Sequence, residues 1–488
     1  MYMGLDIGTS AIKAVLCDEG QSIVAQAEVP LEVSRPHPLW SEQEPEDWWK
    51  AVLNVFGQLR QENALALAAV KSIGIAGQMH GAVLLDHRGK VLRPAILWND
   101  GRCAAECAEL ETREPKSREL TGNIAMPGFT APKLLWVAKH EPEIFGKVAK
   151  VLLPKDYIRF RLTGDYVSEM SDAAGTLWLD VAGRQWSPEM LDATGLSENH
   201  MPRLVEGPDV SGMLKFDISD AFGLPRDAVV AGGAGDNAAG AVGIGAVEPG
   251  QAFLSLGTSG VLFLCNNSFS PNPERTVHAF CHCLPDTWHQ MSVILSAASC
   301  LSWVTQLTGA KDEASLLEEI AADEANADSR LLFLPYLSGE RTPHNDPNAM
   351  GVFFGLTHDS SRAKLGRAVL EGVAFAFADG MDALLSTGEK INHISVIGGG
   401  TRSELWGQIL ADILGRELTY HKGGEVGPAF GAARLARLAV NDDDISAVCP
   451  APEAKVTVKP DPAKAEKYQM KLQRFRRLYT ALKQEFAA

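Results

Sequence analysis

Two short segments of the sequence are nearly identical, and their residue types are suited to holding phosphate. Residues 5–10 (LDIGTS) and 254–259 (LSLGTS) are both apolar runs that end in Gly-Thr-Ser. Glycine lets the backbone approach a ligand closely, and the hydroxyl and amide groups that follow can bind phosphate oxygens. Each segment opens one half of the 488-residue chain. We therefore expect two phosphate-binding hairpins that face each other across a cleft.

The two copies differ in charge, because Asp6 of the first copy is matched by Ser255 in the second. A carboxylate just before a phosphate turn can hold Mg²⁺, directly or through water. Mg²⁺ is normally bound by one or two carboxylates together with phosphate oxygens. The alternative is an aspartate that caps its own turn. The difference predicts that a metal ion would lie beside the first copy.

A second carboxylate, Asp236, stands among small residues just ahead of the second turn, in residues 231–240 (AGGAGDNAAG). This setting fits a helix N-terminus that opens into a cleft, where amide dipoles favour a carboxylate. A carboxylate aimed at a substrate hydroxyl can take its proton as the oxygen attacks phosphorus. A plain helix cap is the alternative role. The position ahead of the second turn favours the catalytic role.

Three more segments follow strand-like runs: residues 78–81 (QMHG), 97–102 (LWNDGR) and 398–403 (GGGTRS). Polar residues at the ends of strands commonly bind ligands in α/β folds. His80 could equally be a core histidine with a satisfied hydrogen bond. Trp98 could be a core aromatic or a wall on which a sugar stacks. The glycine run could lie flat against an adenine or ribose, or could form a plain turn.

Several common signatures are absent from the sequence. There is no GxxxxGK[ST], GxSxG or HExxH segment, and no GxG pair completes GxGxxG, although the pair at 233 and 235 passes the looser form with a final alanine. These absences disfavour the P-loop, Rossmann, esterase and zincin classes.

The elements that must position these residues alternate between strand and helix patterns, which favours α/β domains with mixed sheets. Strand-like runs flank both turns, and apolar residues at helical spacing follow. We expect strands over residues 3–7, 11–18, 70–76, 251–256, 260–265 and 391–397, and helices over residues 47–61, 403–414 and 461–488. The last of these helices is expected to pack on the second domain.

Length and composition set the frame for these elements. A chain of 488 residues exceeds the size of a single core, so two domains are expected. We place the boundary in the small-residue stretch 240–250, which divides the chain into domains 1–245 and 246–488. The net charge of −16 disfavours a nucleic-acid scaffold, because phosphate backbones need basic surfaces.

Cysteine usage and apolar patterning indicate where the protein works. The eight cysteines are scattered without the paired spacing of a zinc site, so we expect buried free thiols in a reducing cytoplasm. No apolar run reaches the length of a membrane span. The N-terminus passes directly into a strand-like segment without the pattern of a secretion signal. We therefore expect a cytoplasmic protein with no membrane or nucleic-acid partner.

Longer blocks give the chain a family resemblance. From about Met3 to about Leu438 it resembles the FGGY carbohydrate kinases of the actin/hexokinase-like ATPase fold. Residues 128–140 (GFTAPKLLWVAKH) look like the first family signature, and residues 351–371 look like the second. One departure is Lys364, where the family usually has histidine or an acidic or amide residue. Blocks that resemble the xylulose-phosphorylating members are residues 34–43, 78–81, 153–157, 171–176 and 338–344.

The resemblance implies a fold and an activity. The fold would consist of two ribonuclease H-like domains with a cleft between them. The activity would be ATP-dependent phosphorylation of D-xylulose at its O5 hydroxyl, in the catabolism of D-xylose, with Mg²⁺. The alternatives are a family member that acts on ribulose, glycerol or gluconate, and a non-enzymatic actin-like ATPase. A homodimer is a further expectation.

The resemblance also implies roles for individual residues. Asp236 would be the general base, and Asp6 would help to hold Mg²⁺ and orient the γ-phosphate. The ketose would be bound by Met79, His80, Asp236 and Asn237, with Trp98 as a candidate wall. The phosphates and adenosine of ATP would be held by Thr9, Ser10, Lys13, Gly257, Thr258, Gly399, Gly400 and Ser403.

Overall fold

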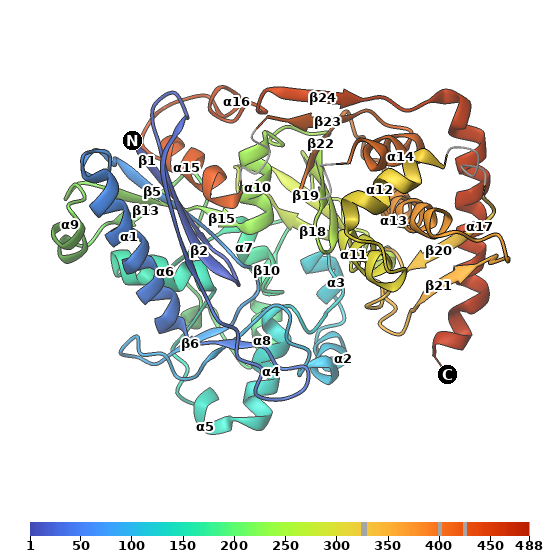
Figure 1. Ribbon diagram of the computed structural model, residues 1–488. Helices are drawn as coiled ribbons and strands as arrows, with labels where there is room; N and C mark the ends of the chain where they lie inside the picture. Colours follow the sequence, from blue (N-terminus) through green and yellow to red (C-terminus); the bar gives the residue numbers. More distant parts are fainter. Residues whose placement is uncertain (324–328, 399–402, 423–426, 488) are drawn as a thin grey trace.

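The computed structural model describes residues 1–323, 329–398, 403–422 and 427–487. Two large β-sheets, one from each half of the sequence, are flanked by helices (Figure 1). The predicted glycine run at Gly399 and Gly400 lies outside the described residues.

The first sheet is built from the N-terminal half, in the order β13-β14-β5-β1-β2-β3, with β15 also paired to β5. Its strands are β1 (Tyr2–Ile7), β2 (Ala11–Cys17), β3 (Ile23–Pro30), β5 (Ser72–Gly77), β13 (Val210–Met213), β14 (Val229–Ala231) and β15 (Ala234–Gly235). The β1–β2 hairpin is antiparallel, whereas β5 runs parallel to β1.

The second sheet repeats this plan in the order β18-β19-β17-β16-β22-β23-β24. Its strands are β16 (Gln251–Leu256), β17 (Gly260–Asn266), β18 (His278–Cys281), β19 (Trp288–Ile294), β22 (His393–Ile397), β23 (Leu418–His421) and β24 (Ala454–Val458). The antiparallel pair β16–β17 and the parallel partner β22 correspond to β1–β2 and β5. The repeated Gly-Thr-Ser segments are therefore the turns of two equivalent hairpins, as the sequence predicts.

Two helices lie between the sheets and join the halves. They are α10 (Asp236–Ile244) and α15 (Pro428–Leu438), and Figure 1 shows α15 beside β1 and near α10. Helix α15 comes from the second half of the sequence but packs on β1 and β5 of the first sheet. This approach requires glycine, because a Cβ at Gly4, Gly74 or Gly431 would overlap backbone atoms of the facing element.

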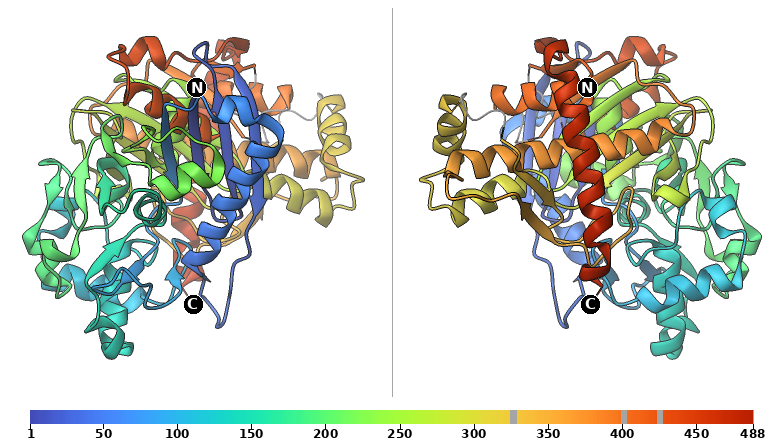
Figure 2. Two further views of the ribbon diagram at one scale, coloured as in Figure 1. Left: turned by 90° about the vertical axis from the view of Figure 1, so that its left-hand side faces the viewer. Right: turned by 90° about the vertical axis from the view of Figure 1, so that its right-hand side faces the viewer.

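The outer faces are covered by longer helices. On the first sheet, α1 (Pro45–Leu67) packs against β2 and β3 and α6 (Pro154–Thr163) against β5. Around the second sheet lie α11 (Ala298–Leu307), α12 (Glu313–Ala322), α13 (Arg362–Leu385), α14 (Glu404–Leu414) and α17 (Pro462–Phe486). Figure 2 shows α17 running along one side of the molecule. Its buried residues include Tyr468, Leu472 and Phe475, which confirms the prediction that this helix packs on the second domain.

Shorter elements fill the lower part of Figure 1 and the edges of the molecule. The helices are α2 (Ala104–Arg113), α3 (Ser117–Thr121), α4 (Thr130–His140), α5 (Pro142–Phe145), α7 (Met170–Ala174), α8 (Pro188–Ala193), α9 (Phe216–Phe222) and α16 (Ile445–Val448). The strands form the pairs β4 (Glu42–Gln43) with β7 (Ala95–Ile96), β6 (Val83–Leu85) with β8 (Lys150–Leu152), β9 (Val167–Glu169) with β12 (Arg203–Val205), β10 (Leu179–Asp180) with β11 (Gln185–Trp186), and β20 (Leu332–Pro335) with β21 (Gly351–Phe354).

The small-residue stretch before the second sheet differs from a simple linker. Residues 236–244 form helix α10, because alanine and glycine let it pack closely on α15. The division at residue 245 stays a prediction.

All eight cysteines are free and buried, as predicted. Within the described residues, no helix is both long and apolar enough to cross a bilayer.

Candidate active site

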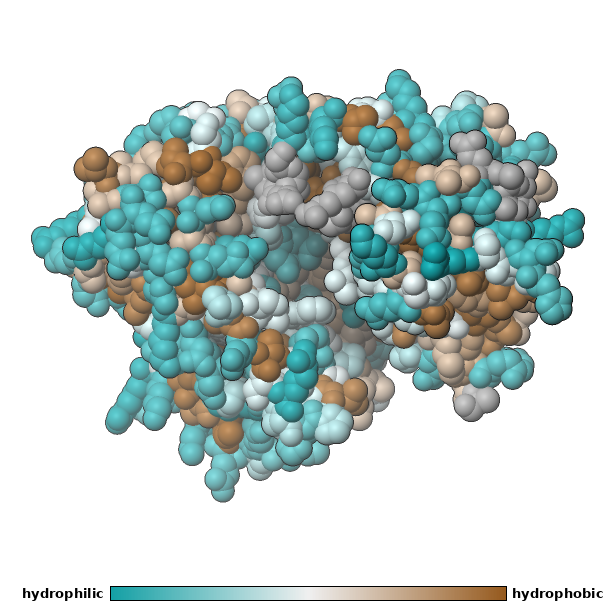
Figure 3. Space-filling model, viewed as in Figure 1, coloured by the Kyte–Doolittle hydropathy of each residue, from teal (hydrophilic) through white to brown (hydrophobic). Residues whose placement is uncertain are grey.

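The site is built where three parallel strands of the first sheet end side by side. In register, Asp6 of β1 lies opposite Ala76 of β5, and Gly235 of β15 lies opposite Gly77 of β5. The residues that follow β5 and β15 are therefore brought beside Asp6. The molecular surface is deeply hollowed between the two halves (Figure 3).

Asp6 and Asp236 face each other closely enough for their charges to interact. Burial and, to a smaller extent, the charge of Asp236 raise the pKa of Asp6 to about 7, against the opposing charge of Lys13. Burial raises the pKa of Asp236 to about 6, against hydrogen bonds from Asn237. Two carboxylates held this way repel each other unless a cation or a proton lies near them. The pair fits a divalent cation.

Asp236 is the first residue of α10, as the sequence predicts, and its carboxylate is oriented by its neighbour. The Asn237 backbone N–H and side-chain Nδ2 both donate to Asp236 Oδ1, at 2.7 and 2.9 Å. Within the described residues no hydrogen bond ends on Oδ2. That oxygen is available as an acceptor.

His80 is held as a neutral imidazole with one nitrogen free to accept. Burial and, to a smaller extent, the charge of Lys133 lower its pKa to about 3. Its Nδ1 lies 2.6 Å from the carbonyl oxygen of Gly175. A carbonyl only accepts, so Nδ1 carries the proton and Nε2 keeps its lone pair. His80 also adopts a left-handed backbone (φ 68°), which turns the chain after Met79.

Met79 and Trp98 are the two large apolar side chains that the sequence predicts to contact the sugar. Met79 is buried, and a Cβ at Gly175 or Gly235 would contact its side chain. Trp98 is 45% exposed, which disfavours a purely core role. Its indole Nε1 donates to Thr9 Oγ1 at 3.0 Å. Trp98 thus contacts the first Gly-Thr-Ser turn, and Thr9 of that turn contacts Gln78, the residue after β5.

In the first turn, the Thr9 hydroxyl already donates its proton within the protein, so backbone N–H groups are the donors that remain for a phosphate. Thr9 Oγ1 donates to Gln78 Oε1 at 2.9 Å, so that proton is already used. Ser10 is exposed, and its carbonyl accepts from Leu31 N–H at 2.8 Å. Lys13 lies 3.6 Å from Glu28. The roles of Thr9, Ser10 and Lys13 in binding phosphate stay predictions.

The second turn is supported by the start of α11. The carbonyls of Gly257 and Thr258 accept from Ala298 N–H and Ala297 N–H, at 2.8 and 2.9 Å. Beside Thr258 lies a pocket of about 380 Å³, lined by Thr258, Ala298, Ser299, Ser302, Trp303 and Gln306. These α11 residues were not predicted, because nothing in their types distinguishes them from an ordinary amphipathic helix.

Of the residues predicted to bind adenosine, the structure describes only Ser403. Ser403 is the N-cap of α14, and its hydroxyl oxygen accepts from Trp406 N–H at 3.2 Å. Its role in binding adenosine stays a prediction, as do those of Gly257 and Thr258.

A buried charge cluster beneath the base was also missed by the sequence reasoning. Lys155 Nζ lies 2.7 Å from Asp156, 3.2 Å from Asp172 and 3.5 Å from Glu169, all with fully buried side chains. Such a cluster is tolerated inside a protein only when its members pair. The clue in the sequence was charge within otherwise apolar blocks, at residues 153–157 and 171–176.

This cluster holds the segment that carries Asp236. Ser171 Oγ accepts from Gly235 N–H at 3.0 Å and donates to Glu169 at 2.9 Å. Arg159 pairs with Asp156 and donates to the carbonyl of Gly232. The backbone just before Asp236 is therefore held by hydrogen bonds from this cluster of paired charges.

Comparison with known proteins shows the family to which the chain belongs. The model of the FGGY family of carbohydrate kinases, N-terminal domain, matches residues 1–243, and that of the C-terminal domain matches residues 252–440. The chain belongs to the FGGY family of carbohydrate kinases. Its fold is accordingly the two-domain, actin/hexokinase-like fold of these kinases.

Similar FGGY kinases include one curated protein and two solved structures. The chain is 55% identical to xylulose kinase from Escherichia coli (strain K12) over 99% of each chain. It matches the crystal structure of a xyloylose kinase from Brucella ovis with a TM-score of 0.96 and 51% identity, over 99% of each chain. A gluconate kinase from Lactobacillus acidophilus matches with a TM-score of 0.92 and 27% identity, over 98% of this chain and 97% of that one.

Proposed function

We propose that this FGGY kinase transfers the γ-phosphoryl group of ATP to the O5 hydroxyl of D-xylulose. The observation that carries the proposal is Asp236 at the N-terminus of α10, facing Asp6 where the strands of the first sheet end. Full-length similarity to two proteins named as xylulose and xyloylose kinases supports the choice of sugar.

In this proposal the ketose is bound by residues on both sides of β5. Asp236 Oδ2 takes the proton of O5 as that oxygen attacks phosphorus. His80 Nε2, which is a lone-pair acceptor, receives a hydrogen bond from another sugar hydroxyl. Asn237 fixes the carboxylate of Asp236, and Met79 and Trp98 contact the carbon face of the sugar.

ATP is held by the two equivalent turns. The amides of Thr9 and Ser10 and those of Gly257 and Thr258 bind phosphate oxygens, and the nucleoside occupies the pocket beside Thr258. Asp6 would hold Mg²⁺, which would supply positive charge beside the phosphates. The described residues contain no cluster of three metal-binding side chains. Mg²⁺ suits such a site, because it is bound largely through phosphates.

We further place the enzyme in the cytoplasm, where its eight free cysteines stay reduced. A homodimer stays a prediction.

A coupled kinase assay with ATP and Mg²⁺ on a panel of sugars tests the substrate. The panel contains D-xylulose, D-ribulose, glycerol and gluconate. We expect kcat/KM for D-xylulose to exceed that for each other sugar by about tenfold or more. A higher kcat/KM for another member would overturn the choice of sugar. ATP-dependent polymerisation without turnover on any sugar would instead favour the non-enzymatic alternative.

A further inference from the structure

A hydrogen-bond network of fixed polarity connects the candidate ketose site to the first Gly-Thr-Ser turn. Trp98 Nε1 donates to Thr9 Oγ1 at 3.0 Å, and Thr9 Oγ1 donates to Gln78 Oε1 at 2.9 Å. Because the indole N–H can only donate, it leaves the hydroxyl proton to point at Gln78. Gln78 is the residue before Met79 and His80.

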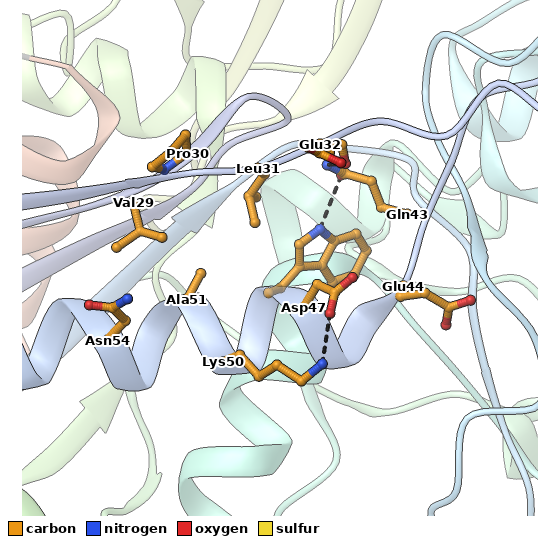
Figure 4. Close-up of a pocket in the computed structure, with 11 residues that line it drawn as sticks. Val29, Pro30, Leu31, Glu32, Gln43, Glu44, Asp47, Lys50, Ala51 and Asn54 are labelled. Carbon is orange, nitrogen blue, oxygen red and sulfur yellow. Dashed lines mark hydrogen bonds and ion pairs between the residues drawn. The ribbon is translucent and has the colours of Figure 1, made fainter.

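The network continues through a second buried amide. Gln78 Nε2 donates to Gln43 Oε1 at 3.1 Å, and Trp48 Nε1 donates to the same oxygen at 3.0 Å. Gln43 Nε2 in turn donates to the carbonyls of Thr9 and Glu32, at 2.8 and 3.0 Å. Figure 4 shows Gln43 beside Glu32 at one end of a surface pocket.

This arrangement holds Thr9 at two points. Its hydroxyl is held by Trp98 and Gln78, and its carbonyl by Gln43. Gln78 and Gln43 are only 2% and 4% exposed, so a partner lost here is not replaced by bulk water. A main-chain bond from Gln78 N–H to Ile7 O at 2.9 Å ties the same two segments together.

The other end of the network is anchored in the same way. Strand β4, which carries Gln43, pairs with β7, which leads to Trp98, and Leu97 N–H donates to the Ser41 carbonyl at 3.0 Å. The side chains that would contact the ketose and the turn that would hold phosphate therefore share one set of bonds.

We propose that Thr9, Gln78 and Gln43 are positioning residues through which a bound ketose sets the first phosphate turn for transfer. A sugar against Trp98 and His80 fixes the indole and the Gln78 segment, and these fix Thr9. The backbone amides of the turn are thereby held where the γ-phosphate must lie. The inference deepens the proposed function, but it requires only that some sugar be phosphorylated with ATP.

The test compares Thr9→Val, which removes the hydroxyl at nearly constant shape, with Thr9→Ser, which keeps it. For Thr9→Val we expect kcat to fall on the order of tenfold or more, while KM for the sugar changes by less than about threefold. Binding of a non-hydrolysable ATP analogue should be strengthened by the sugar in the wild type and in Thr9→Ser. This strengthening should be lost in Thr9→Val.

Two further variants keep the result interpretable. Gln78→Glu retains the acceptor for Thr9 but loses the donor to Gln43, so it should shift kcat and analogue binding in the same direction, even if Thr9→Val does not fold. Thr112→Val removes a hydroxyl that bonds Ala108 O on an exposed part of α2 and should match the wild type.

Two results would overturn the inference. One is equal kcat and equal sugar-enhanced analogue binding in Thr9→Val and Thr9→Ser. The other is a rise in KM for the sugar with kcat unchanged, which would make the network a binding feature only. The measurements use whichever sugar the panel selects. Absence of turnover on D-xylulose would therefore count against the proposed substrate and leave this test intact.

Discussion

At the scale of single residues, the chemistry depends on how the protein holds two carboxylates that repel each other. Asp6 and Asp236 both have raised pKa values, mainly because they are buried. A base must be ionised to take a proton. A bound divalent cation would favour the ionised form of Asp6 and leave Asp236 as the carboxylate that limits activity on the acid side.

The pH dependence of the reaction follows from this. We expect kcat/KM for the sugar, at saturating ATP and Mg²⁺, to be constant above neutral pH and to fall as the pH decreases through about 6. The fall reflects protonation of Asp236. A pH–rate profile from about pH 8 to about pH 5 measures it. A profile that stays flat to the acid end would contradict the assignment of the base.

Part of this site could be predicted from the types and spacing of residues in the sequence. The helix N-terminus at Asp236 followed from small residues ahead of a phosphate turn, and the structure confirms it. The tautomer of His80 and the use of the Thr9 hydroxyl proton could not be predicted. Both depend on partners, Gly175 and Gln78, that the fold brings from far along the chain.

At the scale of elements, the closeness of α15 to its neighbours is set by glycines. A Cβ at Gly431 would overlap the carbonyl oxygen of Ala239 in α10, and one at Gly4 or Gly74 would overlap the backbone of α15 itself. Helix α15 thus joins the second half of the chain to the first sheet and to the helix that begins with Asp236.

Gly431→Ala should therefore destabilise the protein by about 2 kcal/mol or more. The added methyl group would push the backbone of α15 away from that of α10. Gly57→Ala is a matched control in α1, where a Cβ would meet nothing within 4 Å, and it should be neutral or stabilising by about 0.5–1 kcal/mol. Denaturant unfolding of both variants measures the difference. Equal midpoints for Gly431→Ala and the wild type would contradict the packing argument.

The elements themselves were largely predictable, because strands and helices carry local periodicity. The predicted strand over residues 251–256 is β16, and the predicted helix over residues 403–414 is α14 within one residue. The packing of α15 on the opposite half was not predictable. Glycines in a helical pattern show that something approaches closely, but not which element approaches.

At the scale of the whole molecule, the repeated turns correspond to a duplicated architecture. The arrangement β2-β1-β5 recurs as β17-β16-β22, and each hairpin carries one Gly-Thr-Ser turn. The copies diverged where Asp6 is replaced by Ser255 and where Asp236 precedes only the second turn. On the proposed function, the repeated hairpin would supply two phosphate turns, and the difference between the copies would place the metal on one side and the base beside the acceptor.

The central claim is that Asp236 takes the proton of the sugar hydroxyl. It is tested most directly by kcat of Asp236→Asn with ATP, Mg²⁺ and D-xylulose, measured beside the affinity of the same variant for ATP. Because asparagine keeps the shape but cannot act as the base, kcat should fall by about a hundredfold or more while ATP binding is unchanged. Retention of more than roughly a tenth of the wild-type kcat would contradict the claim.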